Sequence, residues 1–213
     1  DLGVCSYHFD NPDRGFSFSR KGPLDMRLNQ HSGITASELV NTLPVFDLIN
    51  LFRTLGEEPL ARRIALAIDT RRKQTRFDTT DELATVVKDA VPLAVQRRMS
   101  IHPATRVFQA LRMAVNDELG ELEQAMEQAW EALQVGGRMS IISFHSLEDR
   151  LVKRFMAKRA KGCVCPPKFP VCTCGVKPSL RLIQRKPIVA SPEEISVNPR
   201  SRSAKLRIAE KII

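Results

Sequence analysis

Residues 138–146, with the sequence RMSIISFHS, decide the fold because they place a strand directly before a helix. The apolar and β-branched residues of 138–144 predict a mostly buried strand. Ser146-x-x-Asp149 then has the pattern of a helix start. The expected buried positions of this helix are Leu147, Leu151, Phe155 and Met156. A strand that leads into a helix in this way is typical of α/β proteins.

Further elements are expected on both sides of this stretch. A long amphipathic helix from Val107 to Leu133 precedes it and ends at Gly136-Gly137, a pair typical of helix C-termini. Asp1 to Val4 read as a short buried strand, and the apolar alternation over 204–208 predicts a last one. The sequence therefore predicts an α/β fold whose sheet has parallel character.

Residues 35–101 contain only helical signals. Two capping boxes, Thr35-x-x-Glu38 and Thr79-x-x-Glu82, start helices. Helical spacing of apolar residues predicts two more helices between them. This block interrupts the α/β pattern, so we interpret it as an inserted all-helical domain.

The block divides the chain into three predicted segments. Residues 1–34 form the first part of the main domain, 35–101 the insertion, and 102–213 the second part. Within the first part, residues 6–27 hold two Gly, two Pro and several Asp and Asn. Such a composition is typical of an ordered functional loop rather than a helix.

Charge is distributed unevenly along the chain. Residues 150–213 hold 16 Lys and Arg against 3 Asp and Glu, a net charge of +13. Residues 1–149 hold 17 against 21, a net charge of −4. A basic C-terminal region on a mildly acidic body favours a polyanionic partner such as RNA, although a solvated tail that keeps the protein soluble has the same composition.

The composition also restricts the cellular location. No apolar run approaches the roughly 18 to 20 residues that cross a bilayer. The chain opens Asp1-Leu2-Gly3-Val4, which has neither a methionine nor the basic start of a signal peptide. Four of the five cysteines lie close together, which suits a metal site better than a disulfide framework. We therefore expect no membrane association and a cytoplasmic location.

In open α/β sheets, ligands bind beyond the carboxyl ends of the strands. Two segments follow predicted strands in this way: the residues after Val4, and Phe144-His145-Ser146. We expect the ligand site there.

Six segments of the chain, taken in order, have a combined pattern that no single short motif provides. They are DLGVCS at 1–6, RGFS at 14–17, GPLDMR at 22–27, HPATRVFQALR at 102–112 leading to NDEL at 116–119, SFHSLEDR at 143–150 and NPRSRSA at 198–204. Together they resemble the ribosomal RNA small subunit methyltransferase H family, also called MraW. The resemblance covers nearly the whole chain.

This resemblance implies a Rossmann-like methyltransferase sheet interrupted by a helical substrate-recognition domain. It implies that S-adenosyl-L-methionine is the cofactor and that the reaction is methylation of cytosine N4 in the 16S rRNA of the small ribosomal subunit. Family members carry a glycine-rich cofactor loop that does not precede Asp1, so the chain looks like an N-terminally truncated member. For the cofactor, the resemblance leaves Asp1 and His8, where His8 stands in place of a usual glutamine and Cys5 in place of a usual serine.

The chemistry requires acceptors for the N–H groups of a cytosine amine, whose lone pair is delocalised into the ring. Acceptors would make the nitrogen more nucleophilic and take up its developing positive charge. The candidate acceptors are Asp25, Ser143 and backbone carbonyls near the strand ends, and His145 is a further candidate catalytic residue. His145 has an alternative interpretation as a hydrogen-bonded turn residue, and Asp149 as a carboxylate that complements the helix N-terminus.

Four residues are candidates for contacts with the RNA. Arg106 lies near a helix start, where a cation is unfavourable, and this favours a phosphate partner. Asn116 within a helix is either a packing hydrogen bond or a site residue. Arg200 and Arg202 belong to the basic C-terminal region.

The remaining signal is a candidate metal site in the Cys-rich loop 162–175, which contains Cys163-x-Cys165 and Cys172-x-Cys174. Four thiolates on one loop can complete a tetrahedral shell for a structural zinc ion. Reduced thiols and disulfides remain alternatives.

Two other functions remain open at this point. One is a non-catalytic, zinc-stapled RNA-binding module. The other is a DNA cytosine-N4 methyltransferase, but Cys5-Ser6-Tyr7-His8 lacks the prolines that are usual at the catalytic strand end of those enzymes.

Overall fold

The computed structural model describes residues 3–163, 165, 171 and 173–213. The chain forms two compact units. We call Val4–Glu118 the helical unit, and Asp1–Gly3 with Leu119–Ile213 the sheet unit. Within the described residues, no helix has both the length and the hydrophobicity needed to cross a membrane.

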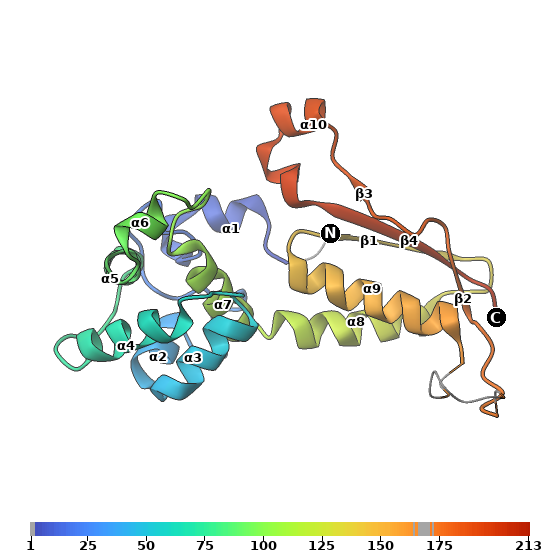
Figure 1. Ribbon diagram of the computed structural model, residues 1–213, viewed down its shortest axis with the longest axis horizontal. Coiled ribbons are helices and arrows are strands. Elements are labelled where there is room, and N and C mark those ends of the chain that lie inside the picture. Colours follow the sequence, from blue (N-terminus) through green and yellow to red (C-terminus); the bar gives the residue numbers. More distant parts are fainter. Residues whose placement is uncertain (1–2, 164, 166–170, 172) are drawn as a thin grey trace. The chain divides into compact units, whose positions relative to one another are not determined.

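The described helical unit consists of helices and the loops that join them, of which residues 15–35 form a long one (Figure 1). These are α1 (Ser6–Asp10), the 3₁₀ helix η1 (Pro12–Arg14), α2 (Ala36–Thr42), α3 (Val45–Thr54), α4 (Ala61–Arg72), α5 (Thr80–Ala90), α6 (Leu93–Gln96) and α7 (Thr105–Val115). The capping box at Thr35 is confirmed, since Glu38 N–H donates to Thr35 Oγ1 at 3.1 Å and Thr35 N–H to Glu38 Oε2 at 2.7 Å. The prediction that residues 6–27 lack helix is wrong, because Cys5 and His8 cap α1 and Asn11 caps η1.

One hydrophobic core holds this unit together. Phe52, Leu83 and Leu111, from α3, α5 and α7, are fully buried in it. Leu24 and Met26 of the early loop are buried in the same core. The loop is therefore anchored on the helices by its own apolar side chains.

The single helix predicted from Val107 to Leu133 is wrong. The chain instead forms α7, breaks at Asn116 and Asp117, and continues as α8 (Glu118–Ala132). Asp117 has a left-handed backbone with φ of 44°, which no α-helix accommodates. Apolar periodicity continues across the break, so the pattern alone did not reveal it.

The sheet unit combines helices with a four-stranded sheet (Figure 1). After α8 its elements are β1 (Arg138–Ser143), α9 (Ser146–Lys161), β2 (Leu180–Leu182), β3 (Ile188–Val189), α10 (Pro192–Val197), the 3₁₀ helix η2 (Pro199–Ser203) and β4 (Lys205–Lys211). The predicted strands at 138–144 and 204–208 are thus confirmed, as is the helix predicted directly after the first of them. The predicted strand Asp1–Val4 is not seen at Gly3 and Val4, and Asp1 and Leu2 lie outside the described residues.

The predicted parallel pairing is wrong for the strands described. β4 lies between β1 and β2 and pairs antiparallel with both, and β3 also pairs antiparallel with β4. β1 and β2 consequently run in the same direction, but β4 separates them. The mixed α/β class is confirmed. The strand next to β1 in the sheet is β4, from the last residues of the sequence, and not the strand that follows β1 along the chain.

One face of this sheet packs against α8 and α9 (Figure 1). Met139 of β1 and Ala209 of β4 face each other in the register and are buried against Trp130 and Phe155. The Trp130 and Phe155 rings meet edge to face at 6.4 Å. This packing holds the start of α9 at the carboxyl end of β1.

Candidate functional site

In the helical unit, the early loop folds back on itself around Arg14. The Arg14 guanidinium donates from Nη2 to the carbonyl oxygens of Arg27, at 2.8 Å, and Leu28, at 2.9 Å. Gly15 has a φ of +70°, and a Cβ there would lie 2.1 Å from the carbonyl oxygen of Pro23. The two sides of the loop therefore touch along their backbones, and only glycine fits at the contact.

Asp25 and Arg27 form an ion pair on this loop. Arg27 Nε lies 2.8 Å from Asp25 Oδ1 and Nη2 lies 2.9 Å from Oδ2, a bidentate arrangement. The hydrogen bonds from Arg27 outweigh partial burial and hold the pKa of Asp25 below its ordinary value. Asp25 is therefore an ionised acceptor at neutral pH, and its side chain is 16% exposed.

Asn116 holds the same loop from the end of α7. Its Nδ2 donates to Met26 O at 2.8 Å, and its Oδ1 accepts from Leu28 N at 2.7 Å. Met26, between Asp25 and Arg27, has a left-handed φ of 64°, a conformation that costs a non-glycine residue free energy. Asn116 is thus a clamp for a strained loop, and its contacts are hydrogen bonds of the kind that the packing interpretation describes.

His8 and Arg106 also lie in the helical unit. Nδ1 of His8 accepts from Cys5 N at 3.2 Å, and the ring lies against Phe16 at 5.3 Å between centroids. Burial and the nearby Arg14 charge lower the pKa of His8. Arg106 donates to the carbonyl oxygen of Glu57 at 3.4 Å. This carbonyl partly offsets the unfavourable position of the cation at the helix start. Asp1 lies outside the described residues.

In the sheet unit, Ser143 and His145 lie where β1 leads into α9. Ser143 is 1% exposed, and its hydroxyl donates to Lys205 O of the neighbouring strand at 3.4 Å. His145, rather than the predicted Ser146, is the N-cap of α9. Its Nδ1 accepts from Glu148 N at 3.4 Å, and its Nε2 lies 3.2 Å from Glu148 Oε1.

Two carboxylates stabilise this turn. Glu148 Oε2 accepts from the N–H groups of Phe144, at 2.8 Å, and His145, at 3.3 Å. Burial alone would raise the pKa of Glu148, but these hydrogen bonds and His145 hold it below its ordinary value. Asp149 accepts a bidentate pair from Arg207 of β4, at 2.7 and 3.1 Å.

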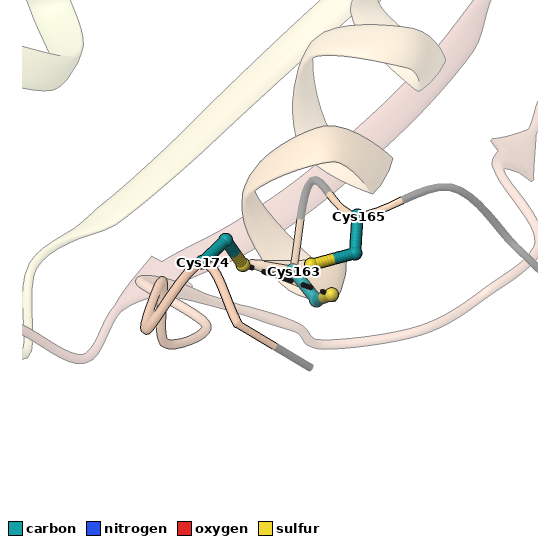
Figure 2. A group of neighbouring side chains, drawn as sticks. All are labelled: Cys163, Cys165 and Cys174. Atoms are coloured by element: carbon teal, nitrogen blue, oxygen red, sulfur yellow. Dashed lines mark hydrogen bonds between the residues drawn. The ribbon is translucent and has the colours of Figure 1, made fainter. Parts of the chain in front are cut away.

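The remaining predicted residues are spread over the sheet unit. Arg200 and Arg202 are exposed on η2, directly before β4. Cys163, Cys165 and Cys174 lie together after α9 (Figure 2). Cys172, the fourth predicted ligand, lies outside the described residues.

The structure therefore brings four of the predicted residues into two groups. Asp25 and Asn116 share one loop cluster in the helical unit, and Ser143 and His145 share one turn in the sheet unit. Sequence reasoning missed Arg14 and Arg27 as members of the first group. Both are present in the quoted motifs at 14–17 and 22–27. The available signal was two arginines at the ends of a loop segment that contains Gly15 and Gly22.

Comparison with known proteins decides the family. The model of the MraW methylase family matches residues 1–212. The chain belongs to the MraW methylase family. Ribosomal RNA small subunit methyltransferase H of Heliobacterium modesticaldum is 52% identical over 212 residues, which are 100% of this chain and 67% of that protein. The proteins of the same name from Carboxydothermus hydrogenoformans and Dehalococcoides mccartyi are 51% and 53% identical, with 68% and 59% of their lengths covered.

The resemblance inferred from the six segments is thus confirmed, and this member of the methylase family spans about two thirds of the length of those relatives. Their names identify methyltransferases that act on small-subunit ribosomal RNA. The two groups of residues described above lie in segments of this methylase that carried the resemblance. They are therefore the natural candidates for its site.

The Glu148 cap predicts a pH-dependent stability of the sheet unit. Because its folded pKa is below the ordinary 4.5, the carboxylate stabilises the fold above that pH, and the contribution is lost as the pH falls through the folded pKa. Glu148→Gln should lower the free energy of unfolding by about 2 kcal/mol at pH 7. The difference from the parent should shrink below about pH 4.5.

Urea unfolding followed by the fluorescence of Trp130, the single tryptophan of the chain, measures this effect. Glu121→Gln, at an exposed position of α8, is the matched control and should leave stability unchanged at every pH. A constant difference between Glu148→Gln and the parent from pH 7 to pH 3 would contradict the assignment.

Proposed function

We propose that this chain is the substrate-binding and amine-activating part of an S-adenosyl-L-methionine-dependent methyltransferase that modifies N4 of a cytosine in 16S rRNA. The family match over residues 1–212 carries the proposal. The names of the relatives support small-subunit ribosomal RNA as the substrate. They do not favour the DNA-methylating and non-catalytic alternatives.

In this proposal Asp25 is the acceptor for one N–H of the cytosine amine. Its carboxylate is ionised and partly exposed, and Arg27 fixes its orientation by two hydrogen bonds. Oδ1 already accepts two hydrogen bonds from Arg27, whereas Oδ2 accepts one, so Oδ2 can accept an amine without loss of the ion pair. As the amine attacks the methyl group, the fixed negative charge offsets the positive charge that develops on nitrogen.

Arg14 and Asn116 are positioning residues in the same proposal. They hold the backbone of residues 26–28 through carbonyl and amide contacts between 2.7 and 2.9 Å. A carboxylate on a loop held at this many points moves little, and alignment of amine, methyl and sulfur depends on such rigidity.

The cofactor supplies the reactive methyl group when bound. His8 and Phe16 fit part of a site for it, because an imidazole with one nitrogen used by its own helix lies against an aromatic ring. Phe16 is itself buried, so the pair offers a polar contact on an imidazole that the core holds in place. We propose His8 as a contact of the cofactor, together with Asp1, which lies outside the described residues.

Ser143 and His145 shape the turn after β1. Both are nearly buried and bonded within the sheet unit, so we propose that they position the backbone of residues 144–146 for the reaction. We further propose that the sheet is part of a Rossmann-like domain, that residues 35–101 are a helical insertion for substrate recognition, and that the protein acts in the cytoplasm on the small ribosomal subunit.

Contact with RNA should make binding depend on salt. If four phosphates are bound through residues 150–213, affinity for single-stranded rRNA should fall about 50-fold between roughly 50 and 200 mM salt. Arg200→Ala with Arg202→Ala should reduce the slope of log affinity against log salt by about 1.4. Fluorescence anisotropy with a labelled decoding-region fragment measures both.

Arg138→Ala is the control for this measurement. Arg138 lies outside residues 35–101 and 150–213, and its guanidinium pairs with Glu210 at 3.3 Å, so the slope should not change. Equal affinity at low and high salt would contradict an electrostatic RNA contact.

The methylation itself is tested with the full-length gene product, labelled S-adenosyl-L-methionine and small subunits that lack the modification. We expect label in the 16S rRNA, at cytosine N4 after nuclease digestion, and none in duplex DNA. Label in DNA, or at another atom of the RNA, would overturn the proposed function.

A further inference from the structure

We propose that Cys163, Cys165 and Cys174 bind a zinc ion that joins the two ends of the connection between α9 and β2. This site takes no part in methyl transfer. It goes beyond the proposed function, because a metal ion there would stabilise the sheet unit whatever substrate the protein modifies.

The sulfur positions match the geometry of a zinc thiolate site. The three Sγ atoms all lie within 4.8 Å of one another, and those of Cys163 and Cys174 are 3.8 Å apart. With Zn–S bonds of about 2.3 Å, two corners of a tetrahedron are about 3.8 Å apart. Figure 2 shows the three side chains converging from both sides of the connection. A disulfide, in contrast, requires about 2.05 Å.

The backbone brings the two sides together without help from a metal. Ser179 N donates to Arg159 O at 3.0 Å, which fixes the chain just before β2 to the last turns of α9. Gly162 has a φ of +67°, and a Cβ there would lie 2.5 Å from the backbone of Lys177 and Pro178. Cys163 follows this contact directly, so its thiol is held close to the side of the connection that carries Cys174.

The ligand chemistry favours zinc. Thiolates are soft ligands, and a set of sulfur atoms in tetrahedral geometry selects zinc over magnesium or calcium. Each thiol that binds releases a proton to solvent, so three thiolates bring three negative charges to the ion. Lys161 and Lys177 adjoin the site in sequence and offset part of this charge. The site we propose consists of these three ligands, and the fourth corner is left to solvent.

The experiment loads the reduced full chain with one equivalent of Co²⁺ or Zn²⁺ under anaerobic conditions. We expect one metal ion per chain by elemental analysis, and with Co²⁺ the intense visible bands of a tetrahedral thiolate complex. Added Zn²⁺ should displace Co²⁺ and abolish the bands, whereas Mg²⁺ should not. Cys163→Ser, Cys165→Ser and Cys174→Ser should each weaken Co²⁺ binding at least about 100-fold.

Cys5→Ser is the matched control, since Cys5 is an exposed cysteine of the helical unit and no member of the cluster. It should bind metal as the parent does. Circular dichroism of each variant separates loss of metal from loss of fold.

The proposal is overturned if the folded parent shows no visible bands of a tetrahedral Co²⁺ thiolate complex, or if the three cluster variants bind Co²⁺ as tightly as Cys5→Ser. The metal-loading experiment does not depend on methyl transfer. Failure of the metal site would therefore leave the proposed function untouched, and failure of methylation would leave the metal site untouched.

Discussion

Replacement of Asp25 by alanine is expected to lower kcat for methyl transfer about 100-fold, with a much smaller change in KM for the RNA. Loss of a fixed acceptor that meets charge developing in the transition state typically costs this much. The carboxylate is held ionised by Arg27, so the effect should be the same at pH 6 and pH 8, well above its lowered pKa. Single-turnover kinetics with the full-length gene product measure the chemical step.

Arg27→Met is the comparison that separates the two roles of this pair. It removes the ion pair but leaves a carboxylate, which is still ionised at neutral pH because the ordinary pKa of the group is 3.8. If Asp25 contacts the amine, Arg27→Met should slow the reaction far less than Asp25→Ala. Equal losses in the two variants would show that Asp25 serves only to hold Arg27, and the proposed acceptor would be wrong.

Replacement of Arg207 by methionine should lower the free energy of unfolding of the sheet unit by about 3 kcal/mol. Arg207 and Asp149 are 12% and 13% exposed at the side chain and share two hydrogen bonds. Removal of one partner leaves a nearly buried charge without its main counterion, which costs more than the pair contributes. Lys205, 3.4 Å from Asp149, offsets a part of this loss.

Arg181→Met provides the matched control on the same sheet. Arg181 pairs with Glu210 at 2.7 Å, but its side chain is 64% exposed, so the loss should stay below about 1 kcal/mol. Urea unfolding followed by Trp130 fluorescence reports on the sheet unit, because Trp130 is buried in its core. Similar losses for the two arginine variants would contradict the assigned importance of burial.

Local sequence signals predicted most of the individual elements. Apolar periodicity and capping boxes placed α2, α5 and β1 close to their observed bounds, because such signals act over one or two helical turns. The cap of α9 was misplaced by one residue. His145 is a less common N-cap than the serine beside it, and only the hydrogen bonds of Glu148 reveal it.

The partners of these elements were less predictable. Nothing near β1 indicates that its neighbour is β4, more than 60 residues away and antiparallel. The break between α7 and α8 was hidden for a similar reason. Asn116 forms its decisive hydrogen bonds with Met26 and Leu28, about 90 residues earlier in the chain.

By itself, the sequence determined the family and the types of the main elements, because these depend on local patterns and on motifs read in order. Only the tertiary structure decided that Arg27 orients Asp25, that Asn116 holds the strained Met26, and that Cys174 meets Cys163. The Asn116 contact joins segments about 90 residues apart, which burial of apolar side chains brings together. No local pattern records which segments that burial will bring together.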